Sequence, residues 1–478
     1  MRSDRFRISF SMLTVSSIVS AFVLAIGGCN SREMMTVTSE PGSPQSLLNA
    51  RVIGGRKPIS GASIVLAEAG TSGKSSSTVL ATTTSNISGN FSISTFTCAH
   101  AASQLFITAS GGDAGDGPNS DILLIAMLGP CNHLPSGVVI NELSTVAAAY
   151  AFAQFFDPSN PMLLGANGRP GTARYIGITN AGATLGASLV NIAHGSDGAT
   201  LTKGSNSPAT LNSLADILVY CVNAPSPYSN CDTLFGSVPV PAGGSAPTNT
   251  LQAALDIALG PAENVATIFG LLAQVPVVLP YTPVLTAAPN DWLVALNFNP
   301  GDLSGIDFIA IDQAGDVWIT NGTTNTISEL NPPGVELSPA GGYTAGGTLT
   351  DPYGIFVDST GNVWVTNQTG NTVEAMDSTG HTVTGPFGSS ATYTNPSGIV
   401  LDSFGQVWVS NWAMGGNPKD DVTVTTTSGA SAFSISTKAR GAFDLMADTT
   451  VSPNIIWVSH TAPEGSQGSS MTAHPTFR

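Results

Sequence analysis

Charged side chains are scarce in this sequence. Asp, Glu, Lys and Arg together make up 10% of the 478 residues, against about 25% in an average soluble protein. Basic residues are the scarcest, with 15 Lys and Arg against 31 Asp and Glu and a formal net charge of −16. A general nucleic-acid-binding protein needs a basic surface against the phosphates, so the composition excludes that class. The hydrophobic content of 42% is enough to form buried cores in roughly two to four domains.

A largely apolar stretch, Ile8–Ile26, stands at the N terminus. It follows three arginines and ends in Leu-Ala-Ile-Gly-Gly-Cys at Cys29, the pattern of a secretory signal. The ending resembles a bacterial lipobox, which implies that residues 1–28 are a signal peptide and that Cys29 is lipidated. The alternative is an uncleaved membrane anchor, but six Ser and Thr side chains make the stretch a poor span against the ~20 apolar residues needed. We expect an extracytoplasmic lipoprotein held at the membrane by a lipid, with residues 29–46 as a tether.

The residue after this cysteine bears on which membrane holds the anchor. Asn30 stands where some bacteria have the aspartate that retains lipoproteins at the inner membrane. We therefore prefer the outer membrane.

The remaining cysteines are few and even in number: Cys98, Cys131, Cys221 and Cys231. An even count in an exported chain predicts disulfides. Three pairings are possible, and sequence distance favours Cys98–Cys131 with Cys221–Cys231. Zinc is the competing interpretation, but the sequence has neither a Cys-x-x-Cys pair nor a nearby pair of histidines.

Residues 47–135 have the pattern of an all-β domain. Short apolar runs at 62–66 and 104–108 lie between clusters of turn residues. The segments P-x-x-G-A-x-I-x-L (58–66) and S-x-x-x-G-x-F-x-I (85–93) resemble the carboxypeptidase regulatory-like β-sandwich. That family is a structural module without catalytic residues, so the resemblance implies a spacer or binding domain.

Residues 138–274 change to a helical composition. An Ala-rich segment with an acidic first turn begins at Asn141, and similar segments occupy 207–223 and 247–273. The last is divided at Gly260-Pro261, because Pro breaks a helix. We expect an all-α domain here.

The start of the first helix contains residues that could suggest catalysis. Glu142 stands beside Ser144 and Thr145, and an acid beside a hydroxyl nucleophile is one interpretation of this pattern. Capping of the helix start by polar groups is the favoured interpretation. A Pro-rich hinge at 275–294 follows the helical segments.

One block is repeated four times in the C-terminal zone, residues 295–478. The first three copies contain an apolar run, then Asp-x-x-Gly, then a Trp between β-branched residues, and the fourth copy is degraded by an insertion. A period of about 40–50 residues with several short strands predicts the blades of a β-propeller. We expect Asp and Gly to form a hairpin turn, the indole to fill the gap between adjacent sheets, and 372–376 to alternate as a strand nearer the rim. The repeated tryptophans are Trp318, Trp364, Trp408 and Trp457.

These blocks resemble NHL-repeat and streptogramin-lyase-like (virginiamycin B lyase-like) propellers. In such a meander the turn before the first strand and the turn after the second lie on one face, where propellers of this group usually bind ligands. The alternative is that each Asn there only closes its own turn by side-chain hydrogen bonds, and this alternative is favoured. The candidate ligand-binding residues on this face are Asn321, Tyr353, Asn367, Asn411, Trp412 and His460.

The resemblance does not extend to a catalytic site. Streptogramin-lyase relatives use two histidines and a glutamate with a magnesium ion, but after residue 300 the chain has only His381, His460 and His474 and no Glu-x-x-His. Gluconolactonase-like propellers hold calcium with a cluster facing the channel, whereas Asp312, Asp358 and Asp402 of the repeats fall in turns. We expect no catalytic residue, no metal and no cofactor.

The number of blades is low for a propeller. Residues 306–478 span fewer than four periods, four blades are the usual minimum for closure, and relatives generally have more. The tail from Glu464 has no clear third strand for the fourth block. We therefore expect a chain that is cut short and an open ring, whose exposed apolar blade faces invite aggregation or pairing with another chain.

Together these observations predict a mainly β, multidomain protein with an N-terminal β-sandwich, a central all-α domain and a partial C-terminal β-propeller of about four blades. The favoured function is non-catalytic binding through the propeller face, with a protein, a cell-wall glycan or a small molecule as partner. The alternatives are a metal-dependent lyase-like or lactonase-like propeller enzyme and a truncated, non-functional copy of one.

Overall fold

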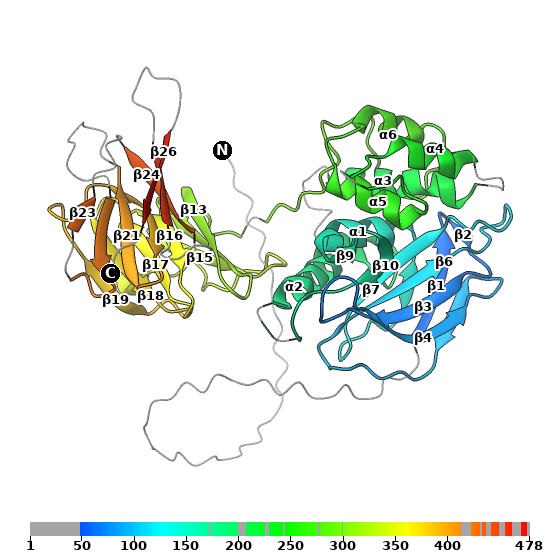
Figure 1. Ribbon diagram of the computed structural model, residues 1–478, viewed down its shortest axis with the longest axis horizontal. Coiled ribbons are helices and arrows are strands. Elements are labelled where there is room, and N and C mark those ends of the chain that lie inside the picture. Colours follow the sequence, from blue (N-terminus) through cyan, green and yellow to red (C-terminus); the bar gives the residue numbers. More distant parts are fainter. Residues whose placement is uncertain are drawn as a thin grey trace, which may run out of the picture. The chain divides into compact units, whose positions relative to one another are not determined.

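The computed structural model describes most of the chain between residues 48 and 475 (Figure 1). The signal peptide 1–28, the lipidation candidate Cys29 and the tether 29–46 lie outside the described residues. Among the described residues, no helix is both long and apolar enough to cross a membrane. Two regions are treated separately below, the N-terminal body (residues 48–298) and the propeller region (residues 300–475). The residues not described are 1–47, 171, 173, 199–206, 225–228, 242–243, 276–277, 299, 413–421, 431–432, 436–440, 449–454, 461–469 and 476–478.

The N-terminal body begins with two facing β-sheets. Between them lies a core that includes Val52, Ile64, Phe91, Ile107 and Leu124. Strands β1 and β5 alternate buried and exposed residues, as strands with one face on a core do. The first sheet has the order β2-β1-β5 with β8 parallel beside β1, its strands being β1 (Leu48–Gly54), β2 (Lys57–Pro58), β5 (Asn90–Ile93) and β8 (Val138–Ile140). The second has the order β4-β3-β6-β7, its strands being β3 (Ser63–Glu68), β4 (Thr78–Thr84), β6 (Gln104–Ser110) and β7 (Leu123–Pro130).

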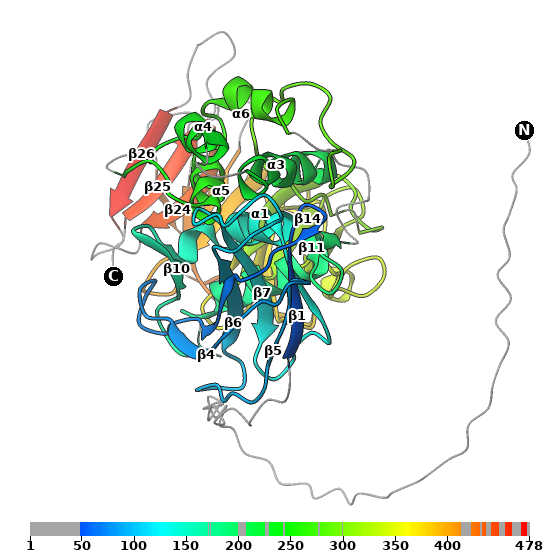
Figure 2. The ribbon, with the colours of Figure 1, turned by 90° about the vertical axis from the view of Figure 1, so that its right-hand side faces the viewer.

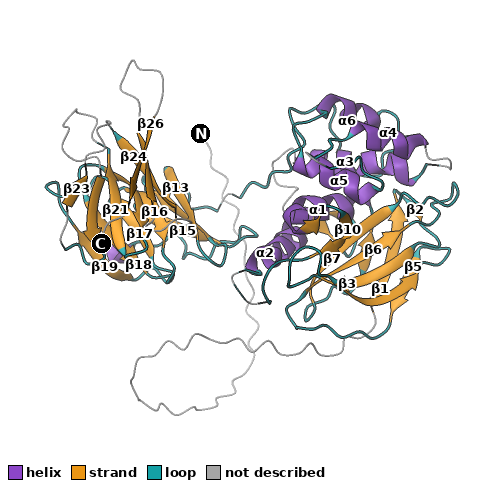
Figure 3. Cartoon of the chain, viewed as in Figure 1, coloured by secondary structure: helices purple, strands orange, loops and turns teal. Residues whose placement is uncertain are grey.

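Six α-helices follow the sandwich among the described residues, and Figure 3 shows them as the helical part of the N-terminal body. The segments predicted as helices at 207–223 and on either side of Gly260-Pro261 are helical. The helices are α1 (Glu142–Phe152), α2 (Ile176–Thr184), α3 (Ser207–Val222), α4 (Ser229–Ser237), α5 (Thr250–Leu259) and α6 (Val265–Leu272). Between α1 and α3 the chain also forms a short 3-10 helix (Ala153–Phe155) and a π-helix (Leu185–Leu189). The same segment contains the short strands β9 (Phe156–Asp157), β10 (Asn160–Leu164), β11 (Val190–Asn191) and β12 (Ser196–Asp197).

The helices and the second sheet share one core. Phe106 of β6 and Ile125 of β7 belong to the same buried cluster as Val146 of α1 and Leu218 of α3. Strands β6 and β7 are buried on both faces, because one face meets the first sheet and the other meets the helices (Figure 2). The sequence predicted a sandwich followed by an all-α domain; in the structure these two segments pack as one body, and the helical segment includes four short strands.

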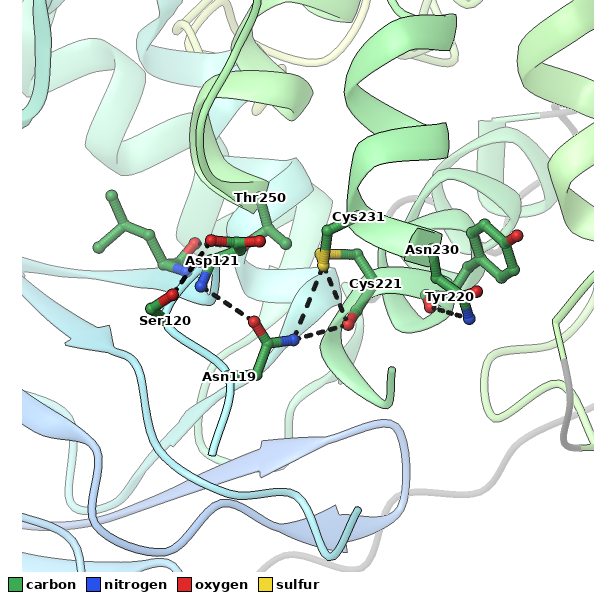
Figure 4. The surroundings of a disulfide bond; sticks show 9 residues. Asn119, Ser120, Asp121, Tyr220, Cys221, Asn230, Cys231 and Thr250 are labelled. Carbon is green, nitrogen blue, oxygen red and sulfur yellow. Dashed lines mark hydrogen bonds between the residues drawn. A yellow bond between two sulfur atoms is a disulfide. The ribbon is translucent and has the colours of Figure 1, made fainter. Parts of the chain in front are cut away.

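Both predicted disulfides are present, Cys98–Cys131 and Cys221–Cys231. The second links α3 to α4 and lies against the sandwich (Figure 4). There, Asn119 donates from Nδ2 to the carbonyl oxygen of Cys221 at 2.9 Å, while its Oδ1 accepts from the backbone N–H of Asp121. The disulfide and this asparagine therefore tie the helices to a loop of the sandwich.

In the part of the propeller region that the structure describes there are four antiparallel sheets, each formed by consecutive strands. We number them blades 1 to 4. Blade 1 contains β13 (Ile306–Ile311), β14 (Val317–Asn321) and β15 (Thr326–Leu330); blade 2 contains β16 (Pro352–Val357), β17 (Val363–Asn367), β18 (Thr372–Met376) and β19 (Thr382–Phe387). Blade 3 contains β20 (Pro396–Leu401), β21 (Gln406–Asn411), β22 (Val422–Thr426) and β23 (Phe433–Ile435); blade 4 contains β24 (Ala442–Asp448), β25 (Ile455–His460) and β26 (Ser470–Pro475).

The repeated tryptophans lie between successive blades in three of four cases. Trp318 packs in one cluster with Ile355 of the next blade, and Trp364 and Trp408 make the equivalent contacts with blades 3 and 4. The prediction that the indole fills the gap between sheets is confirmed for these three. It is wrong for Trp457 of blade 4, which is 37% exposed, because no following blade covers it among the described residues.

The Asp-x-x-Gly turns form as predicted and have a further role. In blade 2, Asp358 Oδ1 accepts from the backbone N–H groups of Thr360 and Asn362, and Gly361 has a φ of +84°, a conformation that favours glycine. Asp358 Oδ2 accepts from Trp364 Nε1 at 2.9 Å, and Asp402 binds Trp408 in the same way. The aspartate therefore closes the turn and also orients the indole.

Two predictions about strands are wrong. The tail does supply a third strand to the fourth block, since β26 pairs with β25 along its whole length; β25 offers it an unpaired edge. Strand β18 does not alternate but is buried along most of both faces. Its one charged residue, Glu374, accepts from Asn367 Nδ2 at 2.7 Å and from Thr348 Oγ1 at 2.5 Å, which makes its burial possible.

Candidate functional site

The predicted ligand-binding positions lie at one end of the blades. Asn367 pairs with Pro352 at the start of the first strand of blade 2, and Asn411 and His460 occupy the same place in blades 3 and 4. Asn321 has this place in blade 1. The sequence predicted this arrangement, because the turn before the first strand of a blade and the turn after its second strand lie at the same end of the blade. We call this end of the propeller region the axial end.

The three asparagines are buried and bonded within their own blades. Asn367 Oδ1 accepts from the backbone N–H of Thr350, which fixes the segment that enters the blade, and its Nδ2 donates to Glu374. Asn321 and Asn411 bind the equivalent segments. Their amides are used to anchor the incoming chain, which agrees with the alternative interpretation of these residues. His460 is also buried, at 2% exposure.

Aromatic side chains from all four blades meet at the axial end. Their ring centroids lie 5.2 to 6.2 Å apart: Phe308 contacts Tyr353 and Phe443, and Phe443 also contacts Tyr353 and Trp412. Pairs at this spacing are favourable beyond the apolar area they bury. Each of the four side chains is partly exposed, so the cluster has a surface that solvent or a ligand can reach.

Of the predicted site residues, the structure therefore brings Tyr353 and Trp412 together. Sequence reasoning missed Phe308 and Phe443. The repeat could have identified Phe443 as a site residue, because it stands five residues before Asp448, as Tyr353 stands five residues before Asp358. Phe308 has no such equivalent, and only the three-dimensional arrangement of blades 1 and 4 reveals it.

Carboxylates flank the aromatic cluster. Asp307 and Asp351 both approach Gly322, where a Cβ would lie 2.6 and 2.7 Å from their oxygens. Partial burial, and then the charge of Asp351, raise the pKa of Asp307. Burial also raises the pKa of Asp444, next to Phe443. The axial end thus combines aromatic faces with acceptor oxygens, and it has no Lys or Arg among the residues named here.

A group of carboxylates at the opposite end of blade 1 belongs to the hairpin turn. Oxygens of Asp312, Asp316 and Glu329 lie within 4.8 Å of one another. Asp312 Oδ1 accepts from the backbone of the turn and its Oδ2 from Trp318 Nε1 at 3.3 Å. Glu329 accepts from Tyr343 Oη, and burial raises its pKa to about 7. These contacts explain the group as part of the turn.

His381 and His460, the histidines of the propeller region whose side chains the structure describes, lie at different places in it. His381 is exposed in the hairpin between β18 and β19, where Nδ1 lies 2.7 Å from Thr379 Oγ1. His460 is buried at the inner end of blade 4. The described residues therefore contain no pair of histidines beside a glutamate like that which the lyase resemblance implies.

Comparison with known proteins finds partial likenesses of low TM-score. No family model and no curated protein matches the chain. Solved structures similar to part of it include a streptogramin B lyase (18% identity, TM-score 0.27, 37% of this chain and 57% of that chain) and virginiamycin B lyase from Staphylococcus aureus (20%, 0.26, 38% and 58%). A gluconolactonase from Xanthomonas campestris is a third (15%, 0.27, 36% and 61%). The chain spans less than two thirds of each, and likenesses of this size say nothing about activity.

Proposed function

We propose that this protein is an exported, lipid-anchored binding protein and that the axial end of its propeller region binds the ligand without catalysis. The observation that carries the proposal is the meeting of four partly exposed aromatic side chains from four blades: Phe308, Tyr353, Trp412 and Phe443. A monomer gains little by leaving such rings accessible at one point, so exposed aromatic groups of this kind mark binding sites.

The chemistry of this surface favours a glycan among the partners considered. Aromatic faces stack on the apolar face of a sugar ring, and the carboxylates of Asp307 and Asp351 can accept hydrogen bonds from hydroxyl groups. A polyanion is disfavoured because the carboxylates would repel it and the whole chain carries a net charge of −16. A cell-wall glycan also fits the extracytoplasmic location inferred from the sequence.

Two features support export and anchoring. The two disulfides are typical of proteins from oxidising compartments, and the lipobox-like segment ends at Cys29. The Cys29→Ser variant should lose incorporation of labelled fatty acid and leave the membrane fraction. Retention of label or of membrane association by this variant would contradict the anchor.

Binding can be tested by isothermal titration with soluble cell-wall oligosaccharides. We expect the Tyr353→Ala and Trp412→Ala variants to bind at least about 10-fold more weakly, which is the size of losing one stacking contact of about 1.4 kcal/mol. Phe433→Ala is the matched control, because Phe433 is an exposed aromatic residue on the outer strand β23. Absence of binding, equal losses in the control, or metal-dependent turnover of a lactone or cyclic ester would contradict the proposal.

A further inference from the structure

The N-terminal body buries a carboxylate that has only one hydrogen-bond donor. Glu68 is the last residue of strand β3 and is 5% exposed. Its Oε2 accepts from the backbone N–H of Ala99 at 2.9 Å, while its Oε1 has no hydrogen-bond partner among the residues that the structure describes. Within the same residues, no Lys, Arg or His forms an ion pair with this carboxylate. Glutamate is rarely buried to this extent unless its charge is paired.

Two other buried glutamates show how this chain satisfies a carboxylate. Both oxygens of Glu142 accept from the backbone N–H of Gly55, and its Oε2 also accepts from Tyr281 Oη. Glu374 accepts at one oxygen from Asn367 and at the other from Thr348. Glu68 differs from both, because one of its oxygens is left for a donor from outside the chain.

That carboxylate lines a cleft of about 350 Å³ in the sandwich, a volume within the range usual for small-molecule sites. Thr71, Thr78 and Thr97 line the same cleft, as does His100, whose Nδ1 is buried without a partner. None of the lining residues is Lys or Arg, and each of them belongs to the described part of the chain. The cleft therefore surrounds a carboxylate with further acceptors and supplies no fixed positive charge of its own.

One wall of the cleft is held in place by a covalent bond. Cys98 lines the cleft and forms a disulfide with Cys131, which is fully buried. The next residue, Ala99, is bonded through its backbone to Glu68 itself. A site whose walls are already fixed binds a ligand without first ordering its own loops.

We propose that this cleft binds the protonated amino group of a small primary amine. An ammonium group has three N–H donors and no acceptor, which complements Oε1 of Glu68 and the threonine hydroxyls, and its positive charge pairs with the buried carboxylate. A metal ion fits less well, because the lining supplies one carboxylate and one imidazole, fewer protein ligands than metal sites usually have. The inference is independent of the glycan proposed for the axial end.

The test is isothermal titration of the purified protein at pH 7 with n-butylamine and with n-butanol, which has the same carbon chain and no charge. We expect the amine to bind and the alcohol not to bind. Glu68→Gln should weaken amine binding at least about 10-fold, the size of losing a hydrogen bond to a charged group. The glutamine can still accept from Ala99, so the variant should keep the fold.

Two control variants place the binding in this cleft. Glu263→Gln removes the same charge from an exposed glutamate of the N-terminal body and should leave amine binding unchanged. Tyr353→Ala, which alters the axial end, should also leave it unchanged, and this separates the result from that for the glycan.

Two further ligands distinguish the sources of such an amino group. Tighter binding of glucosamine assigns the cleft to amino sugars, and tighter binding of Nα-acetyl-lysine methylamide assigns it to the lysine side chains of peptides. Either preference supports an ammonium site, and rejection of both ligands would overturn it.

Other results would overturn the proposal as well. They are equal binding of n-butylamine and n-butanol, unchanged amine binding by Glu68→Gln, and an equal loss in Glu263→Gln. Circular dichroism checks that each variant is folded. If Glu68→Gln is not, Thr97→Lys tests the same cleft, because Thr97 is exposed and a lysine there repels the amine. Amine binding by a folded Thr97→Lys variant equal to that of the natural chain would contradict the site.

Discussion

The two regions of this molecule bury their apolar residues in different ways. In the N-terminal body, both sheets and all six helices contribute to two large cores that meet at strands β6 and β7. In the propeller region, the apolar residues are divided among three smaller clusters, one at each junction between blades. The body thus buries its apolar residues in shared cores, whereas each blade buries its apolar residues against a neighbouring blade.

Both regions bury carboxylates, Glu142 in the body and Glu374 in the propeller region. The propeller region differs in exposing apolar residues at positions that the repeat elsewhere buries. Ile309 of blade 1 is 59% exposed and Trp457 of blade 4 is 37% exposed, while the equivalent residues of blades 2 and 3 are buried. The comparison teaches that a repeat buries its apolar face only against its neighbour. Equivalent residues can therefore differ in burial between the first or last blade and the inner blades, even when their sequences agree.

The largest effect expected is on an inner blade. Trp408→Ala should destabilise the propeller region by about 3–5 kcal/mol, the range for deleting a buried large aromatic side chain, and it also removes the donor to Asp402. Trp457→Ala should cost about 1 kcal/mol in dilute solution, because the side chain is already partly exposed. Urea denaturation of both variants measures the difference. Equal losses would mean that the end blade is packed like the inner ones.

Removing a disulfide should act on the N-terminal body alone. Cys98→Ser with Cys131→Ser opens a loop of 33 residues and should cost roughly 3–4 kcal/mol, and the Cys221 and Cys231 pair, 10 residues apart, roughly 2–3 kcal/mol. Calorimetry should show the transition of the body lowered and that of the propeller region unchanged. A shift of both transitions would mean that the two regions unfold together.

The stability of the body should depend on pH through Glu142. Burial raises the pKa of Glu142 to about 7, although Tyr281 Oη and the backbone N–H of Gly55 donate to its carboxylate. Burial raises the pKa of Asp216 to about 7 as well. Well below their ordinary pKa values of 4.5 for Glu142 and 3.8 for Asp216, both groups are protonated in the folded and in the unfolded state. As the pH rises to 7, the unfolded state releases its protons first, so stability falls, by about 3 kcal/mol for Glu142.

The Glu142→Gln variant checks this dependence. It removes one titrating group and should reduce the loss of stability between pH 4.5 and 7, leaving the part that Asp216 and Asp256 provide. Denaturation midpoints at several pH values measure it. A slope equal to that of the natural chain would show that Glu142 is not the group responsible.

The smallest effects expected concern two glycines without close neighbours. Gly361 lies in a blade hairpin with a φ of +84°, and a Cβ there would meet no atom within 4 Å. Gly361→Ala should therefore cost about 1 kcal/mol through backbone strain alone. Gly270 lies in α6 with equal space, and Gly270→Ala should stabilise by roughly 0.5–1 kcal/mol. Thermal melts distinguish the signs, and matching signs would contradict the assignment of strain.

Local patterns predicted most of the fold. The helix at 207–223 and the break at Gly260-Pro261 could be predicted, because helix composition and proline act within a few residues. The structure has α3 at Ser207–Val222 and a break between α5 and α6. Helix α4 was missed, since its sequence SNCDTLFGS has little apolar periodicity and forms against α3 beside a disulfide. The core that the helices share with the second sheet was not predicted. The apolar run of β6 indicates that both of its faces are buried, but it does not indicate which elements pack against each face.

The candidate site was predictable only in part for the same reason. The repeat places Tyr353, Trp412 and the asparagines at one end of the blades, which is a matter of topology. Whether an asparagine is buried or free depends on the incoming segment, such as Thr350 for Asn367. The meeting of Phe308 with Phe443 joins residues from the first and last blades, and no local pattern in the sequence records the distance between them.

Oxidative labelling of the four repeated tryptophans, read by mass spectrometry, tests most directly that each inner tryptophan is packed between two blades. We expect Trp318, Trp364 and Trp408, which are at most 3% exposed, to be protected, and Trp457, which is 37% exposed, to be labelled. Labelling of an inner tryptophan would show that the blades do not stack in this way. Protection of Trp457 equal to that of the other three would contradict the difference between the inner blades and blade 4.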